Sequence, residues 1–193
     1  MREENIRCIK CGENFKYKGS NWTVLDNNVD GGVLAIMTSY WDGDKHTFDL
    51  DNGNNYAKST LRENLLNKLL PMLGEENLIS HEVDLVANNG DDRYGKVTDK
   101  LFILSYSEYC KYSKNVPLFP TKWMWTCTPF YISDNGNGSF VYVITGTGKR
   151  KHDYAYNCNE VAPACVFNPN KLKVRVLSSR KFNVQRKLQV VEI

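Results

Sequence analysis

The chain has 193 residues, of which 41% are hydrophobic, and a formal net charge of +3, a composition typical of a globular protein with a substantial core. No run approaches the ~20 apolar residues of a membrane-spanning helix, and the charged residues 1–5 lead into no apolar signal core, so we expect a soluble, cytoplasmic protein without membrane contact. Six cysteines are too few for a disulfide-built fold, and we expect them to be reduced.

The first predicted elements are two strands. Residues 22–25 and 33–37 are apolar and flank the turn-rich segment 26–32, which predicts a hairpin or a bulged loop. Residues 42–55 are rich in Gly, Asn and Asp and are expected to form a surface loop. This loop does not match an EF-hand, because counting from Asp49 places Asn54 and Thr60 where that motif has glycine and glutamate.

The first helix is predicted to begin at Thr60. Thr60 and Glu63 have the spacing of a capping box, in which a hydroxyl and a carboxylate each accept a hydrogen bond from a free backbone N–H group. Leucines then recur at helical spacing between residues 61 and 70, and Pro71 follows. We expect the helix to end at this proline.

A second, shorter helix is predicted after two further strands. Residues 82–86 and 101–104 have the pattern of strands, and residues 88–92 that of a loop. Ser105 and Glu108 can cap a brief helix that extends through Tyr112. Later residues favour strands and turns, with 140–144 and 161–167 the best strands, so we expect an α+β fold with a mixed sheet and two helices.

Residues 171–193 differ in charge from the rest of the chain. They carry seven basic residues and the single acid Glu192, a net charge of +6. Residues 1–170 carry the remaining 18 basic and 21 acidic residues, a net charge of −3. Apolar residues alternate with polar ones on both sides of residues 178–180, which predicts a basic β-hairpin with one apolar face. We therefore divide the chain into a domain at 1–170 and a basic hairpin at 171–193. The basic residues of this hairpin are Lys171, Lys173, Arg175, Arg180, Lys181, Arg186 and Lys187.

The segment between residues 129 and 160 has the composition of a binding loop. It combines rigid, amphipathic tyrosines with adaptable polar groups, although a merely solvated Asn/Gly loop has a similar composition. The residues that we expect to contact a partner are Tyr131, Asn135, Asn137, Lys149, Arg150, His152 and Tyr154. Trp123 and Trp125, two residues apart on the preceding strand, are expected to face the core together.

Ordered blocks between residues 22 and 167 carry a family resemblance. They are Trp22 followed by Val-Leu-Asp, the helix start at 56–65, the Thr-Asp-Lys-Leu-Phe segment at 97–108, and the segments at 123–129 and 161–164. The chain resembles a family of uncharacterised domains common in phages, prophages and gut Firmicutes, related in fold to C-type lectins and formylglycine-generating enzymes. Thr126 and Ala162 replace arginines of that pattern. The resemblance implies a C-type-lectin-like topology and a phage or mobile-element origin.

Metal and catalytic motifs are weak. Cys8 and Cys11 form half of a zinc ribbon without a second pair, so they are weak metal candidates, and we expect no cofactor. No Gly-x-Ser-x-Gly or Walker motif is present. Cys158 and Cys165 are the residues that an enzyme of the formylglycine-generating type would have to use.

We expect a non-enzymatic protein that binds a macromolecule. The first hypothesis is an anti-CRISPR-like phage protein that blocks a host defence nuclease ribonucleoprotein, with the basic hairpin contacting a nucleic-acid backbone or an acidic protein surface. The second is a receptor-binding or surface-display lectin-like module. The third is an enzyme of the formylglycine-generating type. Lysines on an edge strand also prevent aggregation, so the basic hairpin need not bind anything.

Overall fold

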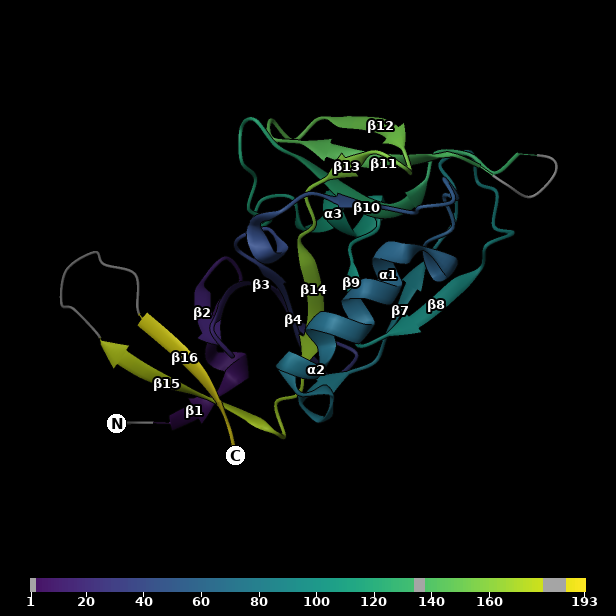
Figure 1. The fold of residues 1–193 in the computed structure, drawn as a ribbon. Helices are drawn as coiled ribbons and strands as arrows, with labels where there is room; N and C mark the ends of the chain where they lie inside the picture. The colour runs from purple at the N-terminus through teal and green to yellow at the C-terminus, as the bar shows by residue number, and fades with distance from the viewer. Residues whose placement is uncertain (1–2, 134–137, 179–186) are drawn as a thin grey trace.

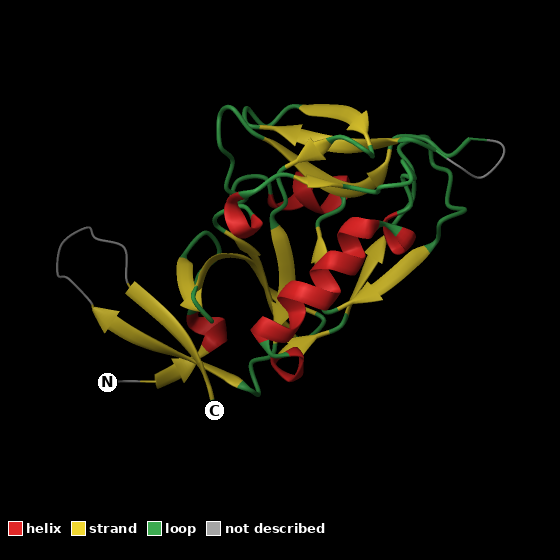
Figure 2. Cartoon of the chain, in the orientation of Figure 1, coloured by secondary structure: helices red, strands yellow, loops and turns green. Residues whose placement is uncertain are grey.

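The computed structural model describes residues 3–133, 138–178 and 187–193 (Figure 1). Strands predominate and two helical segments of more than one turn accompany them in the described part of the chain, which confirms the predicted α+β class (Figure 2). No helix among these residues is long and apolar enough to cross a membrane.

The largest sheet contains nine strands among the described residues. Its order is β1-β15-β16-β2-β3-β4-β14-β6, with β9 also paired to β14, and all pairs are antiparallel except β16 with β2. The strands are β1 (Glu3–Asn5), β2 (Asn14–Tyr17), β3 (Ser20–Val29), β4 (Gly32–Met37), β6 (Leu78–Ile79), β9 (Leu101–Ile103), β14 (Pro163–Phe167), β15 (Leu172–Ser178) and β16 (Lys187–Glu192).

Three smaller antiparallel units complete the described strands. A three-stranded sheet has the order β10-β11-β12, and two pairs join β13 to β5 and β7 to β8. The strands are β5 (His46–Thr47), β7 (His81–Asp84), β8 (Lys96–Asp99), β10 (Trp123–Pro129), β11 (Phe140–Thr145), β12 (Arg150–Tyr154) and β13 (Cys158–Asn159). In Figure 1 the β10–β12 sheet lies at one end of the molecule, and β1, β15 and β16 lie at the opposite end.

The predicted first hairpin is confirmed as β3 and β4, but its turn is tighter than expected. Asp30 and Gly31 both have positive φ, 49° and 76°, as the two-residue turns that match strand twist require. Residues 26–29, which we assigned to the turn, instead extend β3, with shifts in register on both sides of Asp26. The polar residues 26–29 therefore belong to a bulged strand and not to the turn.

The first helix begins and ends differently from the prediction. It comprises α1 (Thr60–Asn64), the π-helix η4 (Leu65–Leu69) and α2 (Leu70–Leu73). Its N-cap is Ser59, not Thr60, because the Ser59 side chain accepts the hydrogen bond from the backbone N–H of Arg62. It continues past Pro71, since the wider π-turn bonds the N–H of Leu70 to Leu65 and so tolerates a residue without an N–H group.

The second helix is as predicted. It is α3 (Tyr106–Tyr112), and Ser105 and Glu108 form a complete capping box. The remaining helical turns are of the 3₁₀ type: η1 (Ile6–Cys8), η2 (Trp41–Gly43), η3 (Tyr56–Lys58) and η5 (Glu75–Asn77).

The core lies on the central strands of the large sheet. Every residue of β4 and β14 is buried. Three rings from β2 and β3 pack edge-on against Phe167, with centroid distances of 5.2–5.3 Å. Leu61, Leu65 and Leu69 supply the buried face of the helix, as their spacing predicts. A buried ion pair joins this helix to β8, where the Asp99 carboxylate accepts two 2.7 Å hydrogen bonds from Arg62.

The C-terminal strands β15 and β16 belong to the large sheet and pair with each other. Leu172, Val174, Leu188 and Val190 are buried, so the predicted alternation is confirmed for these residues. Residues 179–186, with Arg180, Lys181 and Arg186, lie outside the described residues. The basic hairpin as a unit and the division at residue 170 therefore stay predictions.

Candidate functional site

The predicted binding segment contains a β-hairpin. β11 and β12 form this hairpin, and they pair in register from Phe140 opposite Tyr154 to Ile144 opposite Arg150. Arg150, His152 and Tyr154 alternate along β12 and therefore share one face of the sheet. Lys149 precedes β12 and Tyr131 follows β10. Asn135 and Asn137 lie outside the described residues.

A continuous row of rings forms on this face. Tyr154 packs between Tyr156 and Phe140, with centroid distances of 5.2 and 4.1 Å, and Phe140 contacts His152 at 5.2 Å. His152 then lies 4.4 Å from Phe130, which contacts Tyr131 and Tyr142 at 5.8 and 5.4 Å. We call this set the aromatic face: Tyr106, Phe130, Tyr131, Phe140, Tyr142, Arg150, His152, Tyr154 and Tyr156.

The aromatic face is anchored at one end and exposed at the other. At the anchored end, the Arg150 guanidinium lies 5.0 and 4.9 Å from the ring centroids of Tyr106 and Tyr142 and donates a hydrogen bond to Asn88 Oδ1 at 2.8 Å. Burial raises the pKa of Tyr142. At the other end, Tyr154 is 40% and Tyr156 52% exposed. The row therefore combines fixed rings with surface that a partner can contact.

Three consecutive cations, at residues 149–151, lie on or next to the aromatic face and have no acidic partner among the described residues. Among the described residues, Lys149, Arg150 and Lys151 form no ion pair. Lys151 points to the other face of β12, where its Nζ lies 5.0 Å from the ring centroid of Trp123. The acid on that face, Asp153, accepts hydrogen bonds from the amides of two nearby asparagines.

The expectation that both tryptophans are buried is half wrong. Trp125 is only 1% exposed, packs on Phe48 at 5.5 Å and donates a hydrogen bond to a backbone carbonyl. Trp123 is 36% exposed, because it is the first residue of β10 and lies beyond the end of the core. It therefore belongs to the exposed surface near Lys151.

An open cavity of about 360 Å³ adjoins the anchored end of the aromatic face. Tyr106 and Asn88, the two residues that hold Arg150, form part of its lining. Ser105, Thr128 and Asp84 add hydroxyl and carboxylate groups. The cavity therefore offers hydroxyl, amide and carboxylate groups beside a cation.

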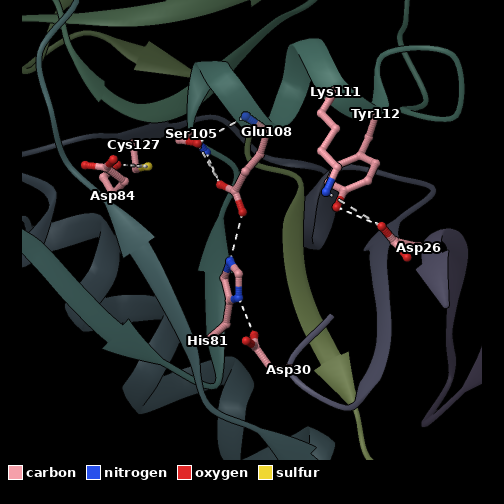
Figure 3. Close-up of polar contacts among 9 residues, drawn as sticks. All are labelled: Asp26, Asp30, His81, Asp84, Ser105, Glu108, Lys111, Tyr112 and Cys127. Carbon is pink, nitrogen blue, oxygen red and sulfur yellow. Dashed lines mark hydrogen bonds and ion pairs between the residues drawn. The ribbon is translucent and has the colours of Figure 1, made fainter. Parts of the chain in front are cut away.

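A second polar cluster connects three elements around His81 (Figure 3). Its Nδ1 bonds to Asp30 in the β3–β4 turn and its Nε2 to Glu108 on α3, at 2.5 and 2.9 Å. Burial alone lowers the pKa of His81, but hydrogen bonds from the protonated ring to the Glu108 and Asp30 carboxylates outweigh it, so the net shift is upward. Because carboxylates occupy both ring nitrogens, neither is free to take a proton from a nucleophile, and the cluster is suited to a structural role.

Sequence reasoning missed this cluster. It identified Glu108 as a capping residue, which is confirmed by its hydrogen bonds to the backbone N–H and Oγ of Ser105 at 2.8 Å. No local signal connects Asp30, His81 and Glu108, since they are separated by 51 and 27 residues.

The cysteines divide into exposed and buried groups. Cys8, Cys11, Cys110 and Cys158 are exposed, whereas Cys127 and Cys165 are buried. Burial raises the pKa of both buried thiols well above the ordinary value. In the part of the chain that the structure describes, no three His, Cys, Asp or Glu side chains lie together so as to hold a metal ion.

Comparisons with known proteins gave no relative for this chain: no family model matches it, and neither a curated protein nor a solved structure matches it.

Proposed function

We propose that this chain is a non-enzymatic binding protein of phage or mobile-element origin, with a C-type-lectin-like fold. Its aromatic face contacts a macromolecule, and the target is a host intracellular factor such as a defence nuclease ribonucleoprotein. Binding then blocks that factor, as an anti-CRISPR protein does.

The observation that carries this proposal is the convergence of Tyr131, Arg150, His152 and Tyr154 on one face. These residues were selected for their composition alone, yet they contact one another or the rings between them. Rings that are already packed lose little conformational entropy on binding, which favours a preorganised contact surface. Lys149 and Arg150 add positive charge, which favours an acidic partner.

The chemistry of the described residues favours binding over catalysis. Both nitrogens of His81 are bonded to carboxylates, and the Cys165 thiol is buried with a raised pKa. A formylglycine-generating type of enzyme needs a reactive thiol, which burial in apolar surroundings disfavours. The Cys158 thiol is exposed, so this alternative predicts a thiol-dependent activity that Cys158→Ser or Cys165→Ser would abolish.

The test is a capture experiment from a bacterial lysate that contains an active nuclease defence system. The immobilised chain is compared with the double variant Tyr154→Ala/Tyr156→Ala and with Met72→Ala, a control on α2 whose residue is 68% exposed. We expect the wild type and the control to retain the ribonucleoprotein and to inhibit its cleavage of target DNA, and the double variant to lose both activities. Equal inhibition by the double variant, or binding to whole cells or glycans instead, would overturn the proposal.

A further inference from the structure

We infer that the aromatic face and the cations of β12 bind an unpaired nucleic-acid strand. This inference rests on the proposed function and identifies the component of the ribonucleoprotein that the chain contacts. It differs from the sequence-based expectation, which assigned a nucleic-acid contact to the C-terminal basic strands.

The first argument is the presence of exposed rings in a row. Proteins that bind single strands without sequence preference stack successive bases on aromatic side chains. Tyr131, Tyr154 and Tyr156 are 38%, 40% and 52% exposed, and the inner rings hold them in place. Because duplex bases are already stacked on one another, this arrangement suits an unpaired strand.

The second argument is charge on the same sheet as those rings. Lys149 and Lys151 are exposed and have no acidic partner among the described residues, so they remain available to phosphates. Arg150 adds a fixed positive charge at the anchored end of the row, where Tyr106, Tyr142 and Asn88 hold it. On the opposite face of this sheet, Lys151 of β12 and Trp123 of β10 combine a cation with an exposed ring. A neutral glycan would not require this charge.

The C-terminal strands offer a poorer site. Arg175 is paired with Glu3 at 2.7 Å, so part of the positive charge there is neutralised. The described residues of β15 and β16 contain no aromatic side chain. This surface lies at the end of the molecule opposite to β12 (Figure 1), so its variants can serve as a charge-matched control.

The cavity beside Arg150 adds groups that can read a base edge. Asn88 and Thr128 supply amide and hydroxyl groups, and Tyr106 supplies a ring wall. Asp84 also lines the cavity and would repel a phosphate, so a base rather than the backbone is expected to enter. Base edges that are unpaired carry free donors and acceptors for such contacts.

The experiment is a titration of the purified chain with labelled oligonucleotides of about 12 nucleotides, a length within the known site sizes of single-strand binders. The same sequence is used as RNA, as single-stranded DNA and as duplex DNA, and binding is followed by fluorescence anisotropy. We expect an unpaired strand, whether RNA, DNA or both, to bind more tightly than the duplex. Tyr154→Ala and Tyr156→Ala should each weaken binding about tenfold, whereas Tyr154→Phe, which keeps the ring, should not.

Salt dependence tests the role of charge separately. Three phosphate contacts to a single strand give a slope of about −2 for log affinity against log salt. Lys149→Gln/Lys151→Gln should reduce the magnitude of this slope, and the charge-matched control Lys173→Gln/Lys187→Gln should not. The opposite ranking would move the site back to the C-terminal strands and overturn the inference.

The failure of this inference can be distinguished from failure of the proposed function. Absence of oligonucleotide binding, or a duplex preference that does not depend on Tyr154 and Tyr156, overturns the nucleic-acid inference. The proposed function survives that result if the same face still captures and inhibits its target after nuclease digestion of the captured material. If the face variants change neither measurement, both proposals are wrong.

Discussion

Removal of the Arg62 guanidinium is predicted to destabilise the protein more than loss of any exposed ion pair. The side chain of Asp99 is 3% exposed and its carboxylate accepts two hydrogen bonds from Arg62, whose side chain is 25% exposed. Arg62→Met would leave this carboxylate buried without a cation. Arg62 Nη1 also donates to the carbonyl of Ala57 at 3.1 Å, a contact that the variant would lose.

The expected cost is about 3 kcal/mol, at the lower end of the range for one partner of a buried pair, because water can reach the partly exposed arginine site. With a urea m-value of about 2 kcal/mol/M, the unfolding midpoint would fall by about 1.5 M. The melting temperature would fall by about 9 °C for a chain of this length. Urea unfolding followed by circular dichroism measures the first quantity directly.

Two further variants make this prediction refutable. Lys96→Met breaks the exposed pair with Glu82, whose side chains are 57% and 59% exposed, and should shift the midpoint by less than about 0.3 M. Arg62→Met/Asp99→Leu removes both charges and should be more stable than Arg62→Met alone, because apolar replacements of buried pairs are often tolerated. The reasoning is refuted if Arg62→Met is as mild as Lys96→Met, or if the double variant is the least stable of the three.

Three other predictions follow from the polar cluster and the thiols. The pKa of His81 is raised in the folded state, so its contribution to stability is complete below the ordinary value of about 6.5 and is lost as pH rises through the raised value. His81→Gln should therefore lower the urea midpoint more at pH 6 than at pH 9, and an equal loss at both pH values would contradict this. Ser105→Ala removes the N-cap of α3 and should cost about 1 kcal/mol in urea unfolding, whereas Ser107→Ala, at an exposed position of the same helix, should cost less than half of that. Iodoacetamide should label the native chain at the four exposed cysteines within minutes and should reach Cys127 and Cys165 only after denaturation, as measured by mass spectrometry. Rapid labelling of either buried thiol in the native chain would contradict the core packing.

Sequence reasoning succeeded where the physical cause is local. The capping box of α3 needs only Ser105 and Glu108, three residues apart, and both of its hydrogen bonds are present. The β3–β4 turn depends on the conformational freedom of two adjacent residues, Asp30 and Gly31. The burial of Leu172 and Val174 follows from alternation along one strand.

It failed where a distant contact or an irregular helix turn overrides a local preference. Thr60 has good capping chemistry, but its hydroxyl and N–H both bond to Asp49, so Ser59 becomes the N-cap. Pro71 is a strong stop signal, but a π-turn that begins at Leu65 lets the helix continue. The first outcome depends on the distant residue Asp49, and the second depends on an irregular helix turn that the spacing of the leucines does not predict.

For the candidate site too, the sequence predicted what depends on local composition and missed what depends on contacts between distant segments. Composition was sufficient to select Tyr131, Arg150, His152 and Tyr154, because tyrosines among adaptable polar groups are typical of binding surfaces. It could not identify Tyr106 or Trp123 as neighbours of the β12 side chains, since these two residues come from other segments. It also could not indicate that Arg175 is neutralised by Glu3, which is 172 residues away.

By itself the sequence determined the class of secondary structure, the helix faces, most strand positions and the types of side chain available for binding. These properties depend on the spacing of neighbouring residues and on their intrinsic backbone preferences. Only the tertiary structure decided the order of the strands, the ring row along β11 and β12, and which charges remain unpaired. The physical reason is that ring stacking and ion pairing are short-range contacts, and the folded chain alone determines which distant residues come within their reach.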